Sequence, residues 1–243
     1  MPEQLWFTEF LNHHLGSFVT GLLHRIGIQP AYPDAPISDP VAMEVLVVLI
    51  LIAFFLAVRA SLSVENPNGL QHSVEAVQEF LAEQADSVIG HGYERYLPYA
   101  IAVGAFILVS NLLGLIPGFE SPTASPTVPL GCAVVTFVYY HYHGIRTQRL
   151  RYGKQFIGPV LGLSWLMLPI ELISHLARIL SLTVRLYANM FAGDMVTMAF
   201  FSLVPVLVPV AFLGLHLFVS LVQTFIFVML TLVYLGMAVS EEH

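Results

Sequence analysis

Charge is scarce in this sequence of 243 residues, of which only 10% are charged while 57% are hydrophobic. A soluble domain normally carries about 25% charged residues, so most of this surface is not expected to face water. Basic residues are also few, with 9 Lys and Arg against 16 Asp and Glu. This balance excludes a nucleic-acid-binding surface.

Cysteine occurs once, as Cys132, which excludes an internal disulfide. The sequence contains no Cys/His pairs at zinc-site spacing and no glycine-rich phosphate loop, so we expect no metal and no cofactor. Its first residues, Met1, Pro2 and Glu3, lack the basic start of a signal peptide, and we expect the whole chain to be retained. These features predict a membrane protein that crosses the bilayer several times.

Long apolar segments indicate where the chain crosses the bilayer, whose hydrocarbon core of about 30 Å needs about 20 apolar residues in a helix. We predict an all-α protein with an external N-terminal segment over residues 1–40 and one membrane domain over residues 41–243. About five spans are expected, at about 41–58, 97–116, 127–142, 156–203 and 206–239.

The last two apolar segments are too long for a straight crossing. A helix over residues 170–203 would be about 51 Å long, and one over 210–239 about 45 Å. Both lengths exceed the hydrocarbon thickness, so we expect a strongly tilted helical hairpin that turns at Pro205 and Pro209. Residues 156–169 are expected to form a short preceding segment, either re-entrant or a helix of its own.

The basic residues predict the orientation, because cytoplasmic loops are enriched in Lys and Arg. One short loop after the third span holds four of them: Arg146, Arg149, Arg151 and Lys154. We therefore place the N-terminus outside and the C-terminus in the cytoplasm. Two other stretches, 5–15 and 72–89, are interpreted as helices at the membrane surface. His141 and His143 are interpreted as solvated loop residues.

Polar residues inside the last hairpin form two stripes. A charge at the bilayer centre costs about 2.5–3.5 kcal/mol, so such charges usually face protein or water. On the first helix the stripe covers about 80° and contains Glu171, His175, Arg178, Arg185 and Asn189. Asp194 lies about 140° from Glu171 around the helix axis, so its side chain is expected to face another surface than the stripe. The second helix carries His216, Ser220, Gln223 and Tyr234, and the two stripes are expected to lie side by side or to line one wet cleft.

Each stripe also has a structural interpretation. Glu171 and Arg178 can close a network through His175, and His216 can serve as an interhelical hydrogen-bonding group. Arg185 is harder to explain in this way, because Glu171, the nearest acid on its face, is about 21 Å away along the helix. We therefore predict that Arg185 meets a partner on another subunit.

Three segments resemble one known family. Residues 182–194 read LTVRLYANMFAGD, residues 223–227 with Tyr234 and the ending SEEH form a second match, and residues 110–117 read SNLLGLIP. These segments resemble the signature around the essential arginine, the last helix and the second span of subunit a of the F-type ATP synthase. The resemblance covers roughly residues 40–243, and the first 40 residues match weakly.

This resemblance implies roles for individual residues. Arg185 matches the indispensable arginine of the family, and Asn189 and Gln223 match polar partners near it. Asp194 falls where many relatives carry glutamate, and His216 falls where some carry histidine. The resemblance implies that a proton enters from outside through an aqueous half-channel lined by Asp194 and His216.

The same resemblance implies an exit and a set of partners. Arg178 sits where relatives often have lysine, and Glu171 sits at a recurrent acidic position. The proton is expected to leave near Glu171 and His175, with Arg185 separating the two half-channels. The expected partners are a rotating ring of subunit c, subunit b of the peripheral stalk, the rest of the ATP synthase and the lipids of a bacterial inner membrane. The chain itself is expected not to be an enzyme.

Two other functions stay open at this point. One is a self-contained secondary ion or anion transporter, in which Arg185 binds an anionic substrate; the missing internal repeat disfavours it. The other is an electron-transfer subunit that binds quinone or haem, which needs paired histidines on facing helices. His175 and His216 are the only candidates for such a pair.

Overall fold

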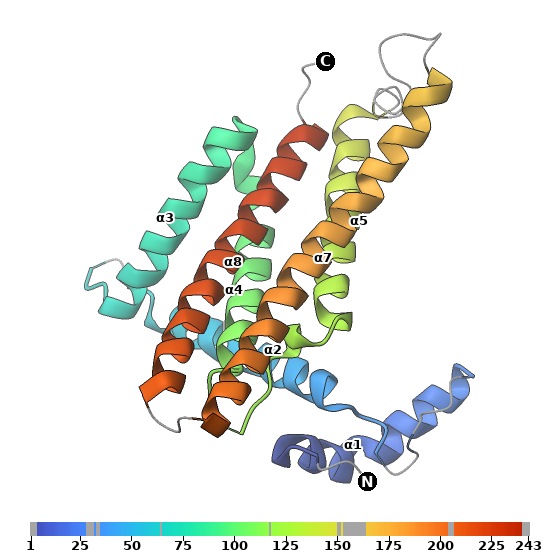
Figure 1. Cartoon of the computed structure of the whole chain (residues 1–243). Coiled ribbons are helices and arrows are strands. Elements are labelled where there is room, and N and C mark those ends of the chain that lie inside the picture. The colour runs from blue at the N-terminus through green and yellow to red at the C-terminus, as the bar shows by residue number, and fades with distance from the viewer. Residues whose placement is uncertain are drawn as a thin grey trace.

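The computed structural model describes residues 4–27, 32, 35–63, 65–116, 118–149, 152, 164–203 and 207–239, and these residues form helices with no β-strand among them (Figure 1). The predicted all-helical fold is confirmed. In chain order the elements are α1 (Trp6–Arg25), α2 (Asp39–Ser61), α3 (Gly69–Ile89), the 3₁₀ turn η1 (Tyr93–Arg95), α4 (Leu97–Leu113), the 3₁₀ turn η2 (Pro122–Ala124), α5 (Thr127–Gln148), α7 (Ser164–Leu203) and α8 (Leu207–Val239).

Two of the described helices are long and apolar enough to cross a membrane. They are α2, with a mean hydropathy of 3.0, and the segment Val210–Val239 of α8, with 2.2. The apolar helix α4 is shorter. Most of the apolar surface of α2 is exposed, as expected for a helix surrounded by lipid. The number of spans and their orientation remain predictions.

Helix α7 differs from its prediction at the start. It runs for 40 residues from Ser164 and contains Pro169, which corresponds to about 60 Å. The sequence suggested a separate segment up to residue 169, but residues 164–169 continue into the same helix. Proline removes one backbone donor, and a membrane helix tolerates this when neighbouring groups satisfy the freed carbonyl. The remainder of that segment and Pro205 of the predicted turn lie outside the described residues, whereas Pro209 lies in the first turn of α8, which begins at Leu207.

Helix α8 is packed against α3, α4, α5 and α7, and Figure 1 shows it between α3 and α7. Glycines allow close approach at these contacts. A methyl group on Gly104 of α4 would come within 2.8 Å of Val228, and one on Gly236 of α8 within 2.9 Å of the Val88 carbonyl of α3. On α5, a methyl group on Gly144 would lie 3.1 Å from the Ala238 carbonyl. The helix axes are therefore closer than larger residues would permit.

The apolar centre of the bundle lies between α4, α5, α7 and α8. Ile107, Leu186, Met190 and Phe227 are fully or almost fully buried there. Their burial fixes which face of α7 turns inward, because residues three and four apart share one side of a helix. The polar stripes of α7 and α8 are positioned by this packing.

The N-terminal helix is longer than the predicted stretch 5–15. It lies at the end of the molecule where α7 ends and α8 begins (Figure 1). The side-chain amide of Asn12 both donates to the carbonyl of Ile37 and accepts from its backbone N–H, each at 3.0 Å. Phe7 and Leu11 pack on Met43 of α2. These contacts attach α1 to the start of α2.

Helix α3 extends the predicted stretch 72–89 by three residues at its start. The Asn68 side chain caps it by accepting from the backbone N–H of Gln71 at 2.9 Å, and the helix ends at Gly90, whose φ is +75°. Leu81 and Ala85 are buried against α4 and α8. The acidic side chains of this helix are exposed: Glu75, Glu79, Glu83 and Asp86.

Candidate functional site

Paired polar side chains connect α7 with α8. Nδ2 of Asn189 donates to Oε1 of Gln223 at 2.8 Å, and the guanidinium of Arg178 lies 5.1 Å from the centroid of the Tyr234 ring. The pairs follow opposite orders along the two helices, which is the register of antiparallel neighbours. Gln223 is only 3% exposed. The two stripes predicted from the sequence therefore face each other in part, with amide and aromatic groups in contact.

Asp194 and His216 form another pair between the same helices. Oδ1 of Asp194 lies 3.7 Å from Nδ1 of His216, and the aspartate side chain is 29% exposed while the imidazole is buried. The bare backbone of Gly193 leaves room for the ring, since a methyl group there would lie 2.9 Å from Nδ1. A carboxylate and an imidazole at this separation can exchange a proton directly after a small movement, or through one water.

Arg185 lies on a different side of α7 and is partly exposed. Its Nη2 donates to Oγ of Ser181 at 3.2 Å. Among the described residues, no carboxylate lies within 4.0 Å of this guanidinium. Exposed apolar side chains, including Leu180 and Val184, lie on the same part of α7. A partly exposed cation in a largely apolar helix without its own counter-ion is the arrangement that the sequence predicted for a residue with a partner elsewhere.

A second polar cluster lies towards the start of α7. Nε2 of His175 is 3.3 Å from Oε1 of Glu171, one helical turn away. On the other side of the ring, the hydroxyl of Tyr140 from α5 is 3.0 Å from Nδ1. Both His175 and Tyr140 are buried, at 6% and 2% exposure. Glu171 and His175 are thus paired, and Arg178, whose guanidinium lies over Tyr234, lines the same small cavity as both of them.

The spacing along α7 places Arg185 between the two clusters. It is nine residues from Asp194 and ten from His175, which corresponds to about 14 Å and about 15 Å along the helix axis. The sequence-predicted residues therefore divide into one group towards the end of α7, one group towards its start, and a lone arginine between them.

A buried polar group at the end of α4 was not predicted. Oγ1 of Thr123 donates to Oδ1 of Asn111 at 2.6 Å and lies 2.7 Å from Oγ of Ser121, which donates to the Ser110 carbonyl at 3.1 Å. Within the described part of the chain, Nδ2 of Asn111 and Oγ of Ser110 have no partner although both are buried. Ser110 and Asn111 lie in the apolar helix α4, and Ser121 and Thr123 reach them because η2 folds back.

Glu120 is a second residue that the sequence analysis missed. It lies in the loop between α4 and η2. Partial burial of its carboxyl group raises the pKa of Glu120, and the negative charges of Asp39 and Asp194 raise it further. The carboxyl groups of Glu120 and Asp194 are therefore close enough to interact electrostatically. A single acid in a loop has no sequence pattern that reveals this proximity.

The interpretation of His141 and His143 as solvated loop residues is wrong. Helix α5 continues to Gln148, past the predicted end at 142, because a helix can outlast its apolar run by one or two turns. Nδ1 of His141 is 2.6 Å from the hydroxyl of Tyr152. The ring of His143 is buried and contacts Tyr96 edge to face at 5.1 Å.

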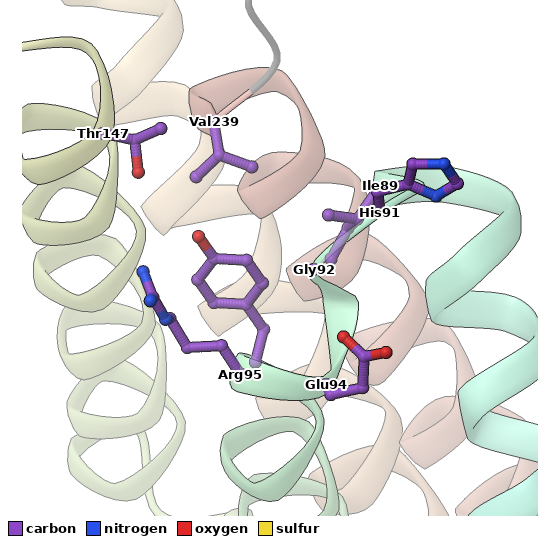
Figure 2. Close-up of a pocket in the computed structure, with 8 residues that line it drawn as sticks. Ile89, His91, Gly92, Glu94, Arg95, Thr147 and Val239 are labelled. Carbon is purple, nitrogen blue, oxygen red and sulfur yellow. The ribbon is translucent and has the colours of Figure 1, made fainter.

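A cavity of about 410 Å³ lies where α3 and η1 meet the ends of α5 and α8 (Figure 2). Arg95, Thr147 and Val239 are among the residues that line it. In Figure 2 the side chains of Arg95 and Glu94 extend to different sides. None of the predicted site residues borders this cavity, so its size does not identify it as the functional site.

The apolar helices and the polar pairs between α7 and α8 define a helical membrane protein with a polar interior. Residues 41–236 match the family described as ATP synthase A chain. The sequence is 55% identical over 244 residues to ATP synthase subunit a of Koribacter versatilis, covering 100% of both chains. It is 46% identical over 233 residues to ATP synthase subunit a of Solibacter usitatus, covering 96% of this chain and 99% of that relative. The chain belongs to the ATP synthase A chain family, and the resemblance found in the sequence is confirmed.

Proposed function

We propose that this chain is the proton-translocating stator subunit of an F-type ATP synthase and that it provides two half-channels separated by Arg185. The observation that carries the proposal is the position of Arg185. It is partly exposed in a largely apolar helix, without a carboxylate within 4.0 Å among the described residues, and along α7 it lies between two acid–imidazole pairs. A carboxylate on a rotating ring of subunit c is the partner that this arrangement fits.

Asp194 and His216 line the outer half-channel. A proton from outside binds first at this pair, because each group stabilises the charged form of the other. It then passes to the ring carboxylate, which is neutral afterwards and can turn into lipid. The exposure of the Asp194 side chain supports this role, since a group that takes protons from water must be reached by water.

Glu171 and His175 line the inner half-channel, with Arg178 one turn further along α7. The ring carboxylate arrives there after almost a full turn and releases its proton to this cluster. Glu171 is more exposed than His175, which suits a carboxylate that hands protons to the cytoplasm. The amides of Asn189 and Gln223 fix α7 against α8 next to Arg185.

Arg185 keeps the two half-channels apart. An opposite charge within ~4–6 Å lowers the pKa of a carboxyl group by ~1–3 units, so the guanidinium favours the ionised ring carboxylate as it passes. It also repels a proton that would otherwise leak straight through. Each charge that moves down the membrane potential releases about 2.3 kcal/mol per 100 mV, and this energy turns the ring.

The proposal includes the orientation and the neighbours. The chain is a non-catalytic subunit in a bacterial inner membrane, with its N-terminus outside and its C-terminus in the cytoplasm, and it contacts the ring, subunit b and the rest of the complex. The apolar face of α7 supports a protein or lipid neighbour, because many of its large side chains are exposed: Ile170, Ile173, Leu176, Leu180, Val184, Met195 and Met198.

The central test replaces Arg185 in the assembled complex. Arg185→Ala should abolish ATP-driven proton pumping and proton-driven ATP synthesis while the complex still assembles, and passive proton leak should persist or rise. Arg185→Lys should also couple poorly, because a compact ammonium lacks the planar fork of the guanidinium. Arg25→Ala, which removes an exposed arginine from α1, is the matched control and should behave like the parent.

Normal ATP synthesis by the Arg185→Ala variant would refute the proposed function. Copurification separates it from a secondary transporter. A stator subunit should copurify with a ring of small hairpin proteins, whereas a transporter should be active alone in reconstituted vesicles and should bind an anion through Arg185.

A further inference from the structure

His175 is held between groups from two different helices. Glu171, one turn before it on α7, approaches Nε2 to 3.3 Å, and Tyr140 on α5 approaches Nδ1 to 3.0 Å. The Glu171 side chain is 32% exposed, whereas the imidazole and the phenol are buried. The three groups therefore form a line that leads from a carboxylate near the surface to a hydroxyl group inside the bundle.

The chemistry of the two neighbours determines the direction of the hydrogen bonds. An ionised carboxylate only accepts, so Nε2 of a neutral His175 carries the proton that faces Glu171. The other ring nitrogen is then an acceptor, and the Tyr140 hydroxyl donates to it. All donors in the line point from Tyr140 towards Glu171, which is the arrangement that a proton relay requires.

We propose that Tyr140 is a proton-relay residue of the inner half-channel, so that α5, and not only α7 and α8, supplies part of the proton path. This inference rests on the proposed function of Glu171 and His175. It assigns a function to a tyrosine that lies in an apolar segment of the sequence and is 35 residues away from its partner along the chain.

One transfer balances as follows. The ring carboxylic acid gives its proton to a water molecule, and this water passes a proton to the Tyr140 oxygen while the phenol proton passes to Nδ1 of His175. The imidazole then releases the proton on Nε2 to Glu171, which passes it to bulk water. Each group gains and loses one proton, and no oxidant or other reactant is needed. The imidazole of His175 is left with its proton on Nδ1, and rotation of the side chain returns that proton to the side of Glu171, whereas handing it back to Tyr140 would reverse the transfer.

The surroundings supply room for the water that this step uses. A cavity of about 10 Å³, roughly the space of one water molecule, lies among these side chains and is lined by Tyr140, Tyr152, Glu171, His175, Arg178 and Tyr234. The charged and titratable groups around His175 thus come from all the packed elements: Glu171 and Arg178 from α7, Tyr140 and His141 from α5, Tyr234 from α8, and Tyr152. Arg178 lies on the side of the cavity towards Arg185 along α7.

A structural role for Tyr140 is the alternative, because a buried phenol usually finds a hydrogen-bond partner and this ring packs in the core with Leu235. The two roles differ in their consequences. A packing role affects assembly and thermal stability of the complex. A relay role affects proton transfer in each assembled complex.

The test uses the assembled complex in inverted membrane vesicles, where the bath is the cytoplasmic side and its pH and isotope can be set. ATP-driven pumping is measured per assembled complex, in H₂O and D₂O and over a range of bath pH. Tyr140→Phe removes the hydroxyl and keeps the ring. Tyr139→Phe is the matched control, because the neighbouring phenol on α5 stacks on Tyr99 at 3.8 Å and lies away from His175.

Tyr140→Phe should slow pumping about tenfold or more, since a positioned proton-transfer group contributes ~10²–10⁴-fold and water replaces it in part. Its pH profile and solvent isotope effect should change, while Tyr139→Phe matches the parent. His175→Gln keeps two hydrogen-bonding ends but cannot relay a proton, so it should show a similar loss. The double variant should be no slower than the slower single variant, because both act in one relay.

Parent-like pumping, pH profile and isotope effect per complex in Tyr140→Phe would overturn the inference, and so would losses that multiply in the double variant. Arg185→Ala, measured in parallel, separates the two levels of the proposal. If Arg185→Ala does not pump and Tyr140→Phe behaves like the parent, the relay is wrong and the proposed function stands. If Arg185→Ala pumps normally, the proposed function itself is wrong.

Discussion

Gly193 is the position where a single methyl group tests the geometry of the Asp194–His216 pair most directly. In Gly193→Ala the added Cβ would lie 2.9 Å from Nδ1 of His216 and 3.1 Å from Cε1. Ordinary contacts of a Cβ begin at 3.4 Å, so the imidazole has to move by 0.5 Å (3.4 − 2.9). The atom that moves is the same Nδ1 that faces Asp194.

The size of this movement determines which measurement is informative. Overpacking costs ~1–3 kcal/mol, while Gly→Ala inside a helix gains ~1 kcal/mol, so the net change in stability is small, roughly 0–2 kcal/mol. Proton transfer depends far more steeply on geometry, since a misplacement of ~1 Å can cost ~10²-fold. A displacement of half that size is therefore expected to slow transfer about tenfold.

We expect Gly193→Ala to assemble normally and to show about a tenfold lower rate of proton-driven ATP synthesis. Gly214→Ala on α8 is the matched control, because a methyl group there meets no atom within 4 Å, and it should synthesise ATP like the parent. Parent-like synthesis by Gly193→Ala would refute the reasoning, because the ring would then tolerate the methyl group without leaving its working position.

Three further outcomes are expected. Asp194→Asn should slow both pumping and synthesis at least about tenfold, whereas Asp194→Glu should retain much of both; parent-like pumping by the Asn variant would make the aspartate structural. Burial raises the pKa of Glu120, so the ionised carboxylate destabilises the folded chain. This destabilisation is present at a pH above the pKa of the folded chain and absent at a pH below the pKa of the unfolded chain. Glu120→Gln should therefore raise the Tm slightly at about pH 8 and leave it unchanged well below the unfolded pKa, at about pH 3; a lower Tm at the higher pH would contradict this. In a Cys132→Ala background, Arg149→Cys should react with an impermeant thiol reagent only from the cytoplasm and His13→Cys only from outside. If both cysteines were labelled from the same side, part of the predicted topology would be wrong.

The sequence was most informative where its residues conflict with a lipid environment. Arg185 stands out because a cation in an apolar helix is costly, and the structure places it on an exposed face with no carboxylate nearby in the described residues. The helical repeat predicted that Asp194 faces another surface than the stripe, but the structure pairs both Asp194 and Asn189 of the stripe with α8, while His175 meets Tyr140 of α5. Periodicity groups residues by direction on one helix, but it does not say which neighbouring helix they meet.

The features that sequence reasoning missed depend on contacts between distant segments. Tyr140 looks like one more apolar residue of its span until α5 is packed against α7, and Thr123 reaches Asn111 only because η2 folds back on α4. The end of α5 was misjudged for a related reason. Hydropathy marks where a helix leaves the apolar layer, whereas backbone hydrogen bonding, which continues to Gln148, determines where the helix ends.

The glycine contacts around α8 also have a mechanical consequence. If α7 faces a rotor that pushes against it at every step, the load passes through the α7–α8 contact into α3, α4 and α5. Bare backbones at Gly104, Gly144 and Gly236 bring these helices to van der Waals distance, and close-packed interiors are hardly compressible. If α7 faces such a rotor, the close packing of α8 makes the bundle resist bending, so less torque is lost in deforming it and more is left for work on the rotor.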